Sequence, residues 1–187
     1  IFGRYTGIGG ISTTQFGKIG GTFVHHIPFN KKWNFAYGTH LVMSIGDSIP
    51  YFEKNFVGAR RREFMGISTS LRGYQPFVID GAFVNMNKAE LKYGLIPYHI
   101  ADLSHLPLPK KWKQTPMGLY LTAFYELGYV GDNSFNNNDN FLKNQWLQGY
   151  GVGLNIVGFY DILFRLEYAR NHLNQGGVYL HGSVPIK

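Results

Sequence analysis

Apolar and polar side chains alternate along most of this chain, and a period of two residues is typical of β-strands. In residues 117–130 the odd-numbered positions are apolar or aromatic, while the even-numbered ones include Gly118, Thr122 and Glu126. Residues 160–171 place apolar side chains opposite Arg165 and Glu167 in the same way. Alternation also covers residues 15–27, 33–46, 83–95, 148–158 and 177–184. The pattern predicts an all-β chain with seven antiparallel strands.

The alternation leaves open which face of each strand is buried. In a soluble sandwich the apolar face points to the core, whereas in a membrane barrel it points to lipid and the polar face lines the interior. The predicted strands are long, about 10–14 residues against a usual 5–6 in soluble sheets. Aromatic residues stand near the ends of the apolar faces, at Trp33, Tyr129 and Tyr168, as in interfacial girdles. We therefore predict a transmembrane antiparallel β-barrel, with a soluble sandwich as the alternative.

The connections between the predicted strands alternate between short and long, as they do in outer-membrane barrels. Residues 28–32 and 158–159 are short turns, which we assign to the periplasmic side. Residues 47–79, 131–145 and 172–176 then fall on the extracellular side, or fold inward. The segment 97–116 does not fit this rule, because it is long, basic and rich in Pro yet lies on the short-turn side.

Composition removes several classes of protein. Charged residues make up 16% of the 187 residues and aromatic residues 17%, which excludes a disordered chain and a coiled coil. The absence of Cys excludes disulfides and thiolate metal sites. The sequence also lacks a run of about 18 apolar residues, which a membrane helix would need. The net charge of +7 comes without a nucleic-acid-binding motif. We assign the basic clusters to solvated loops and expect no nucleic-acid partner.

Sequence motifs for enzymatic chemistry are missing. Residues 66–70 read GISTS and lack the closing Gly of a nucleophile elbow, and no zinc-protease, P-loop or dinucleotide-binding motif is present. The adjacent His25 and His26 would point to opposite faces of a strand and make a poor chelate. We expect no catalytic residues, no cofactor and no metal.

Three groups of residues resemble the BamA-type outer-membrane barrel superfamily. The sequence IPYFEKNF at residues 49–56, followed by SLRGY at 70–74, resembles that family's aromatic approach and its R-G-(F/Y) loop tip. NKAELKY at 87–93 and AFYELG at 123–128 resemble the strands that follow. The resemblance implies a sixteen-stranded barrel, of which residues 1–187 form the C-terminal seven to eight strands. The rest of the barrel and any periplasmic POTRA domains would precede this chain.

The resemblance also implies a specific role for the long loop. Residues 47–80 would fold into the barrel as an inward loop, with a tip formed by Leu71, Arg72, Gly73 and Tyr74. Arg72 would meet Glu126, which stands where the family usually has Asp and lies on the polar face of its strand. The remaining charges on the polar faces would form a ladder in the lumen, and these residues are Lys88, Glu90, Lys92, Arg165 and Glu167.

The function implied is assembly of proteins in the bacterial outer membrane, without cofactor. Unfolded barrel clients would insert at a lateral seam between the first and last strands. In this chain the seam strand would be Gly177, Val178, Tyr179, Leu180, His181, Gly182, Ser183 and Val184. Its partners would be those clients, outer-membrane lipid, and accessory lipoproteins or periplasmic subunits. The alternatives are a dedicated protein-secretion pore of the same superfamily and the barrel anchor of a patatin-like hydrolase.

Overall fold

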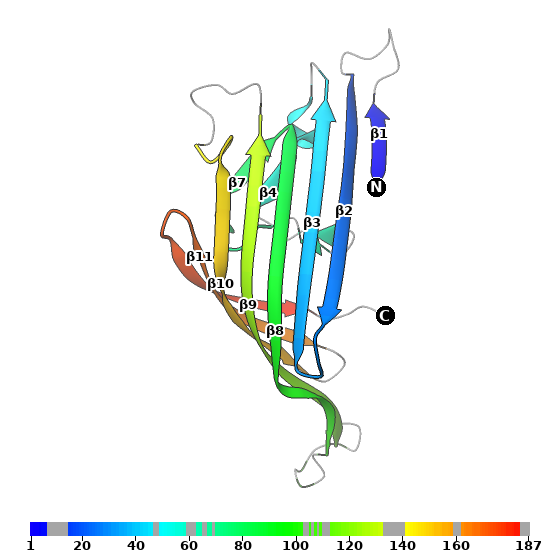
Figure 1. The fold of residues 1–187 in the computed structure, drawn as a ribbon, viewed down its shortest axis with the longest axis vertical. Helices are drawn as coiled ribbons and strands as arrows, with labels where there is room; N and C mark the ends of the chain where they lie inside the picture. Colours follow the sequence, from blue (N-terminus) through cyan, green and yellow to red (C-terminus); the bar gives the residue numbers. More distant parts are fainter. Residues whose placement is uncertain are drawn as a thin grey trace.

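The structure, a computed structural model, describes residues 1–6, 15–46, 49–58, 63–64, 67–68, 70–102, 105, 107, 109, 113–132, 141–158 and 162–183. Its main element is one antiparallel sheet of eight strands in the order β1-β2-β3-β8-β9-β10-β11-β12 (Figure 1). These strands are β1 (Phe2–Thr6), β2 (Phe16–Pro28), β3 (Trp33–Ile45), β8 (Phe83–Asp102), β9 (Gln114–Gly131), β10 (Trp146–Val157), β11 (Leu163–Asn171) and β12 (Gly176–Ser183). Each strand pairs with its neighbours along the chain, except that β3 pairs with β8 across the long inserted loop.

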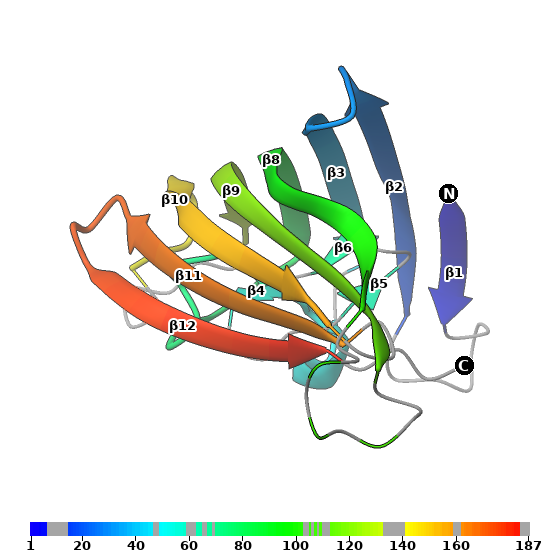
Figure 2. The same ribbon diagram turned by 90° about the horizontal axis from the view of Figure 1, so that it is seen from below.

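The inserted loop lies against one face of this sheet. Its described elements are a 3-10 helix (Tyr51–Glu53), β4 (Asn55–Gly58), β5 (Glu63–Phe64), β6 (Ile67–Ser68) and β7 (Val78–Gly81). The strand β4 pairs with β7, and β5 pairs with β6, so the loop forms two small sheets of its own. Figure 2 shows the main sheet curving into an arc, with β4, β5 and β6 on its inner side.

The predicted fold class is confirmed as far as an all-β chain with one antiparallel sheet. All seven predicted strands correspond to strands of the sheet, whereas β1 was missed because its five residues contain too few alternations to reveal a period. The sheet is not closed into a barrel: β1 and β12 are its two edges in the described part of the chain.

The segment 97–116 was wrongly treated as a connecting segment throughout. The strand β8 continues to Asp102, and β9 already begins at Gln114. Register shifts between Gly94 and Ile96, and between Ile96 and His99, interrupt the pairing at this point. Pro97 lies at the second shift, where a missing backbone N–H costs no regular ladder bond. Pro97 therefore marks a bulge within the continuing pair of strands.

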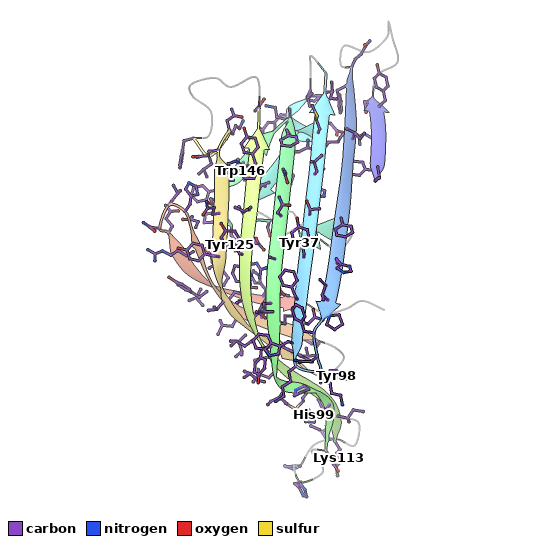
Figure 3. All side chains as sticks on the ribbon, in the orientation of Figure 1. Tyr37, Tyr98, His99, Lys113, Tyr125 and Trp146 are labelled. Atoms are coloured by element: carbon purple, nitrogen blue, oxygen red, sulfur yellow. The ribbon has the colours of Figure 1, made fainter. Side chains whose placement is uncertain are left out.

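The two faces of the sheet carry opposite kinds of side chain. The face toward the inserted loop is polar and buried, and its buried polar residues include His40, Ser44, Thr122, Glu126, Asn155, Glu167 and Asn171. The opposite face is apolar and exposed, as at Tyr37, Leu41, Met43, Leu121, Tyr125, Val152, Ile156, Phe164, Leu166 and Tyr168. Figure 3 shows Tyr37, Tyr125 and Trp146 among the side chains of this outer face. A soluble sheet has the reverse arrangement, with its apolar face covered.

The apolar core is small and joins the inserted loop to one end of the sheet. Its buried members are Val57, Leu71, Tyr74, Ile79, Val84, Met86, Val130, Leu142 and Leu147. Four of these come from the inserted loop and the others from β8, β9, β10 and the turn before β10. Within the described residues, no helix is long and apolar enough to cross a membrane.

Candidate functional site

The side chain of Arg72, at the tip of the inserted loop, is bound by three carboxylates. Its Nε donates to Oε1 of Glu126 at 2.6 Å, its Nη1 to Glu167 at 2.8 Å, and its Nη2 to Glu90 at 2.9 Å. The backbone N–H of Arg72 also donates to Oε2 of Glu126, at 2.8 Å. Three strands of the sheet, β8, β9 and β11, therefore each supply one carboxylate to the loop tip.

The electrostatic environment of Arg72 favours its charged form. Burial alone would disfavour a cation, but the carboxylates of Glu126, Glu90 and Glu167 outweigh it and raise the pKa of the Arg72 guanidinium above its ordinary value. The guanidinium also lies 3.6 Å from the centre of the Phe124 ring, on the same face of β9, which adds a cation–π contact. Only a planar group with several donors can serve three carboxylates and a ring face together.

The backbone of the tip lies close to β10 and β11. Gly73 has φ of +86°, a conformation that disfavours other residues, and its carbonyl accepts a bond from Nδ2 of Asn171 at 3.0 Å. The carbonyl of Arg72 approaches Gly149 so closely that a Cβ there would lie 2.2 Å from it. Gly149 thus leaves the space that lets the loop backbone contact the sheet.

Tyr74, the last residue of the tip, is held by the turn between β11 and β12. Tyr74 is fully buried, and its hydroxyl bonds to Nδ1 of His172 and donates to the carbonyl of Gln148 at 3.3 Å. Burial raises the pKa of the Tyr74 phenol. Leu71 packs on the other side of the tip, with Cδ2 positioned 3.2 Å from where a Cβ of Gly128 would be. The tip is therefore anchored by charge, by backbone bonds and by apolar packing.

The charges predicted to form a ladder converge on this same network. Lys88 lies 3.6 Å from Glu126 and donates to the carbonyl of Ser70 at 2.6 Å. Lys92 lies 3.1 Å from Glu90, and Arg165 lies 3.6 Å from Glu167. A further member, His181 of β12, has Nε2 3.5 Å from Oε2 of Glu167. These charged groups follow one another on the inner faces of β8 and β11, and the same residues also contact the loop tip or its carboxylate partners.

Sequence reasoning paired Arg72 with Glu126 alone and missed most of the other contacts. Glu90 and Glu167 were singled out only as lumen charges, and Phe124, Gly149 and Asn171 were not singled out. Strand register brings them together, because Gly149 pairs with both Glu126 and Asn171. Register across three strands cannot be read from a single sequence, so these residues could not be grouped before the fold was known.

A second ionic cluster holds the base of the inserted loop. Lys54 lies 2.9 Å from Asp132, and Lys143 lies 3.4 Å from both Asp132 and Asp80. Asp132 and Lys143 are buried, and they belong to the ends of the long connection between β9 and β10. The loop is therefore fixed both at its tip and at its base.

The predicted seam strand corresponds to β12, at one edge of the sheet. Residues 177–183 lie within β12 and pair on one side with β11, while Val184 lies outside the described residues. Val178 and Leu180 on its outer face are 69% and 73% exposed. Pairing of the other edge is not found within the described part of the chain, which leaves backbone groups available to another strand.

The arrangement suits holding a loop in place. No three groups of metal-ligating type come together among the described residues. A scan against protein-family models and searches of curated proteins and of solved structures find no match to this chain.

Proposed function

We propose that this chain forms part of a β-barrel of the BamA type in the bacterial outer membrane, and that it assembles other barrel proteins there. The observation that carries the membrane part of the proposal is the inverted distribution of side chains on the main sheet. Exposing an apolar face this wide to water would be costly and prone to aggregation, whereas lipid is a favourable environment for it. The buried polar face would then line the interior of the barrel.

The positions of the aromatic side chains fit a bilayer. On the outer face, Trp33 and Tyr93 form one ring pair, and Tyr129 contacts Trp146 near the other end of the strands. In register, Tyr129 pairs with Asn85, which is eight residues from Tyr93 along β8. That separation is about 26 Å along the strand, or about 20 Å along the membrane normal at a tilt of about 40°. An apolar band about 25 Å tall is typical of outer-membrane barrels.

The polar groups on this outer face also satisfy one another. The hydroxyl of Tyr37 donates to Oδ1 of Asn87, and Nδ2 of Asn87 donates to Oδ1 of Asn85, both at 2.9 Å. Lipid offers no hydrogen bonds, so polar side chains facing it need such partners. The backbone N–H and C=O groups along the two edges of the sheet would also need hydrogen-bond partners in lipid. Further strands, supplied by the rest of a larger barrel, would meet it.

The inserted loop supports the assignment to the BamA type. The arginine of its R-G-Y tip contacts the carboxylate of Glu126, as the resemblance implies, and two further carboxylates. Such a clamp would keep the loop inside the barrel while the seam strand β12 opens. A client strand would then add to the free edge of β12 by main-chain hydrogen bonds. No nucleotide or cofactor is required, because burial and backbone pairing in the membrane drive the insertion.

The proposal is tested by crosslinking a client to the edge of the sheet. Residues 1–187 contain no Cys, so Val178→Cys introduces the one thiol of this part of the protein, on β12. Val152→Cys is the matched control, since Val152 is similarly exposed on the outer face but lies on the interior strand β10. The full native polypeptide in lipid vesicles receives a urea-unfolded eight-stranded barrel protein with one Cys in its last strand.

We expect a disulfide with V178C and not with V152C, together with faster folding of the client than in empty vesicles. Folding is followed by the mobility shift of folded barrels on gels without heating. Unaccelerated client folding, or equal crosslinking at both positions, would contradict the assembly function. A chain that crosslinks at β12 to one dedicated secreted protein but not to the barrel client would instead be a secretion pore.

A further inference from the structure

The far ends of β8 and β9 project beyond the rest of the sheet as a two-stranded arm, residues 95–102 and 114–117. The strand β3 begins at Trp33 and pairs with β8 only as far as Tyr93, and β10 pairs with β9 only as far as Gly118. Figure 1 shows the arm continuing past the turn between β2 and β3 and bending beneath it. In Figure 3, Tyr98, His99 and Lys113 are labelled on this arm.

The arm exposes apolar side chains that the bilayer does not account for. Tyr98 is 54% exposed and Ile100 is 66% exposed, and Leu95 and Ile96 are close to half exposed. These residues lie past the level of the Trp33–Tyr93 ring pair, and therefore past the expected edge of the apolar band. In water, a cluster of exposed apolar residues next to polar ones marks an interaction surface.

The edge of β8 at residues 95–101 has no neighbouring strand in the described part of the chain, although Pro97 has no N–H to donate and the N–H of Tyr98 bonds to Tyr120. The last contact on that side is the backbone N–H of Gly94, which donates to the carbonyl of Lys32 at 2.7 Å. A strand added to residues 95–101 would therefore follow on from β3, with one end against the β2–β3 turn. Open edges of this kind accept extended peptides through main-chain bonds.

A basic cavity lies where that end would be. Its volume is ≈300 Å³, and it is lined by His26, Asn30, Lys31, Lys32, Trp33, Asn34, Lys92 and Tyr120. Three lysines and a histidine face it without a lining carboxylate, although Lys92 contacts Glu90 from behind, at 3.1 Å. The hydroxyl of Tyr120 accepts a bond from the backbone N–H of Tyr98 at 3.1 Å. The cavity and the arm are thus one continuous surface.

We infer that this surface binds an extended, acidic segment of another polypeptide. The segment adds as a strand to the edge of β8 at residues 95–101, and its carboxylates enter the cavity beside Lys31 and Lys32. Backbone pairing supplies affinity for any extended chain, and the positive cavity selects an acidic one and fixes its register. The inference rests on the proposed membrane placement for the edge of the apolar band and for the side of the membrane, which would be the periplasm, where another polypeptide can reach the arm.

The test measures peptide binding to the full chain in lipid nanodiscs by fluorescence anisotropy. The probe is a fluorescein-labelled peptide of eight residues that alternates Val and Thr and carries two Glu at one end, prepared with the Glu pair at either terminus. One control peptide has Lys in place of Glu, and another has Pro at every second position, which removes backbone donors. The protein variant is K31E/K32E, with R170E as a charge reversal at the opposite end of the sheet.

We expect the acidic probe to bind, the K31E/K32E variant to bind it at least about tenfold more weakly, and R170E to bind it unchanged. The Lys and Pro control peptides should bind weakly to the unaltered protein, and salt should weaken binding of the acidic probe. Equal binding of the Pro peptide would overturn the added-strand geometry. Equal binding of the acidic probe by K31E/K32E would mean that the cavity is not part of the binding site. Binding of anionic vesicles in place of the peptide would assign the surface to lipid.

The outcome is independent of the assembly test. Binding of the acidic peptide by a chain that does not fold clients would leave this surface in place and remove the assembly function. Client folding without any binding of the peptide would support the assembly function and contradict the binding surface.

Discussion

Replacing Arg72 with Ala should release the tip of the inserted loop while leaving the main sheet folded. The substitution removes three side-chain bonds to carboxylates, of 2.6, 2.8 and 2.9 Å, and a cation–π contact with Phe124. Glu126 and Glu167 are almost completely buried, so they would lose their closest cation without regaining water. Breaking one buried ion pair typically costs about 3–5 kcal/mol.

The remaining cations would limit this cost. Glu126 keeps Lys88 at 3.6 Å, and Glu167 keeps Arg165 at 3.6 Å, so three lost bonds should not cost three times one bond. We therefore expect a change of about 3–5 kcal/mol in the docking of the tip. Each 1.4 kcal/mol is a factor of about ten, so the undocked fraction should rise by about 10² to 4 × 10³.

Thiol labelling of a buried reporter measures that fraction. Leu71 is fully buried beside Arg72, and L71C introduces a single thiol into residues 1–187, which contain no Cys. The reaction rate of L71C with a maleimide reports how often the tip is undocked. L71C is present in every variant, so its own effect on packing cancels. Gel mobility without heating reports separately whether the sheet remains folded in vesicles.

Arg4→Ala is the matched control. Arg4 also contacts a carboxylate of the inserted loop, Glu53 at 2.6 Å, but its side chain is about half exposed, and exposed pairs contribute about 0–1 kcal/mol. We expect R72A to label at least about a hundredfold faster than the parent and R4A to differ by less than about fivefold. Equal rates in R72A and R4A would refute the argument that the carboxylate network holds the loop.

Two further predictions use the same measurements. Gly149→Ala would place a Cβ 2.2 Å from the carbonyl of Arg72, so the labelling rate of L71C should rise by about tenfold or more. The control is Gly3→Ala, where a Cβ meets nothing within 4 Å, and it should leave the rate unchanged. An unchanged rate in G149A would mean that the tip is not in contact with β10. Val152→Arg on the outer face should lower the free energy of unfolding in vesicles by about 2 kcal/mol, as measured by a urea titration. A change within about 0.5 kcal/mol, as at a water-exposed site, would exclude a lipid-facing sheet.

The network around Arg72 specifies a position for the loop more than it adds to stability. Desolvating four charged groups is costly, and buried ion pairs often do no better than apolar residues of the same size. The ion pairs instead fix the position of the loop tip, because one arginine can bind the three carboxylates of β8, β9 and β11 together at only one place on the inner face. Leu71 and Tyr74 on either side of Arg72 supply the apolar contacts that favour docking.

Several features of the site could be anticipated from local sequence. Glu126 was assigned to the polar face of its strand by alternation, and the tip at residues 71–74 was identified by its resemblance to the R-G-(F/Y) loop tip of the BamA-type superfamily. The contacts of Glu90 and Glu167 with the same arginine could not be anticipated, because β8 and β11 are not neighbours and the curvature of the sheet brings them together. The continuation of β8 past Pro97 was missed because a bulge interrupts the alternation on which the prediction depended.

The sequence by itself determined seven of the eight strands of the main sheet and the apolar or polar character of their faces, since both follow from a local period of two that neighbouring residues impose. Tertiary structure alone decided which face is covered, that Arg72 serves three carboxylates, and that Lys31, Lys32 and Lys92 surround one cavity. These facts depend on the register and curvature of eight strands and on the path of one loop across them. Such long-range relations arise when distant segments pack, and no local pattern records them.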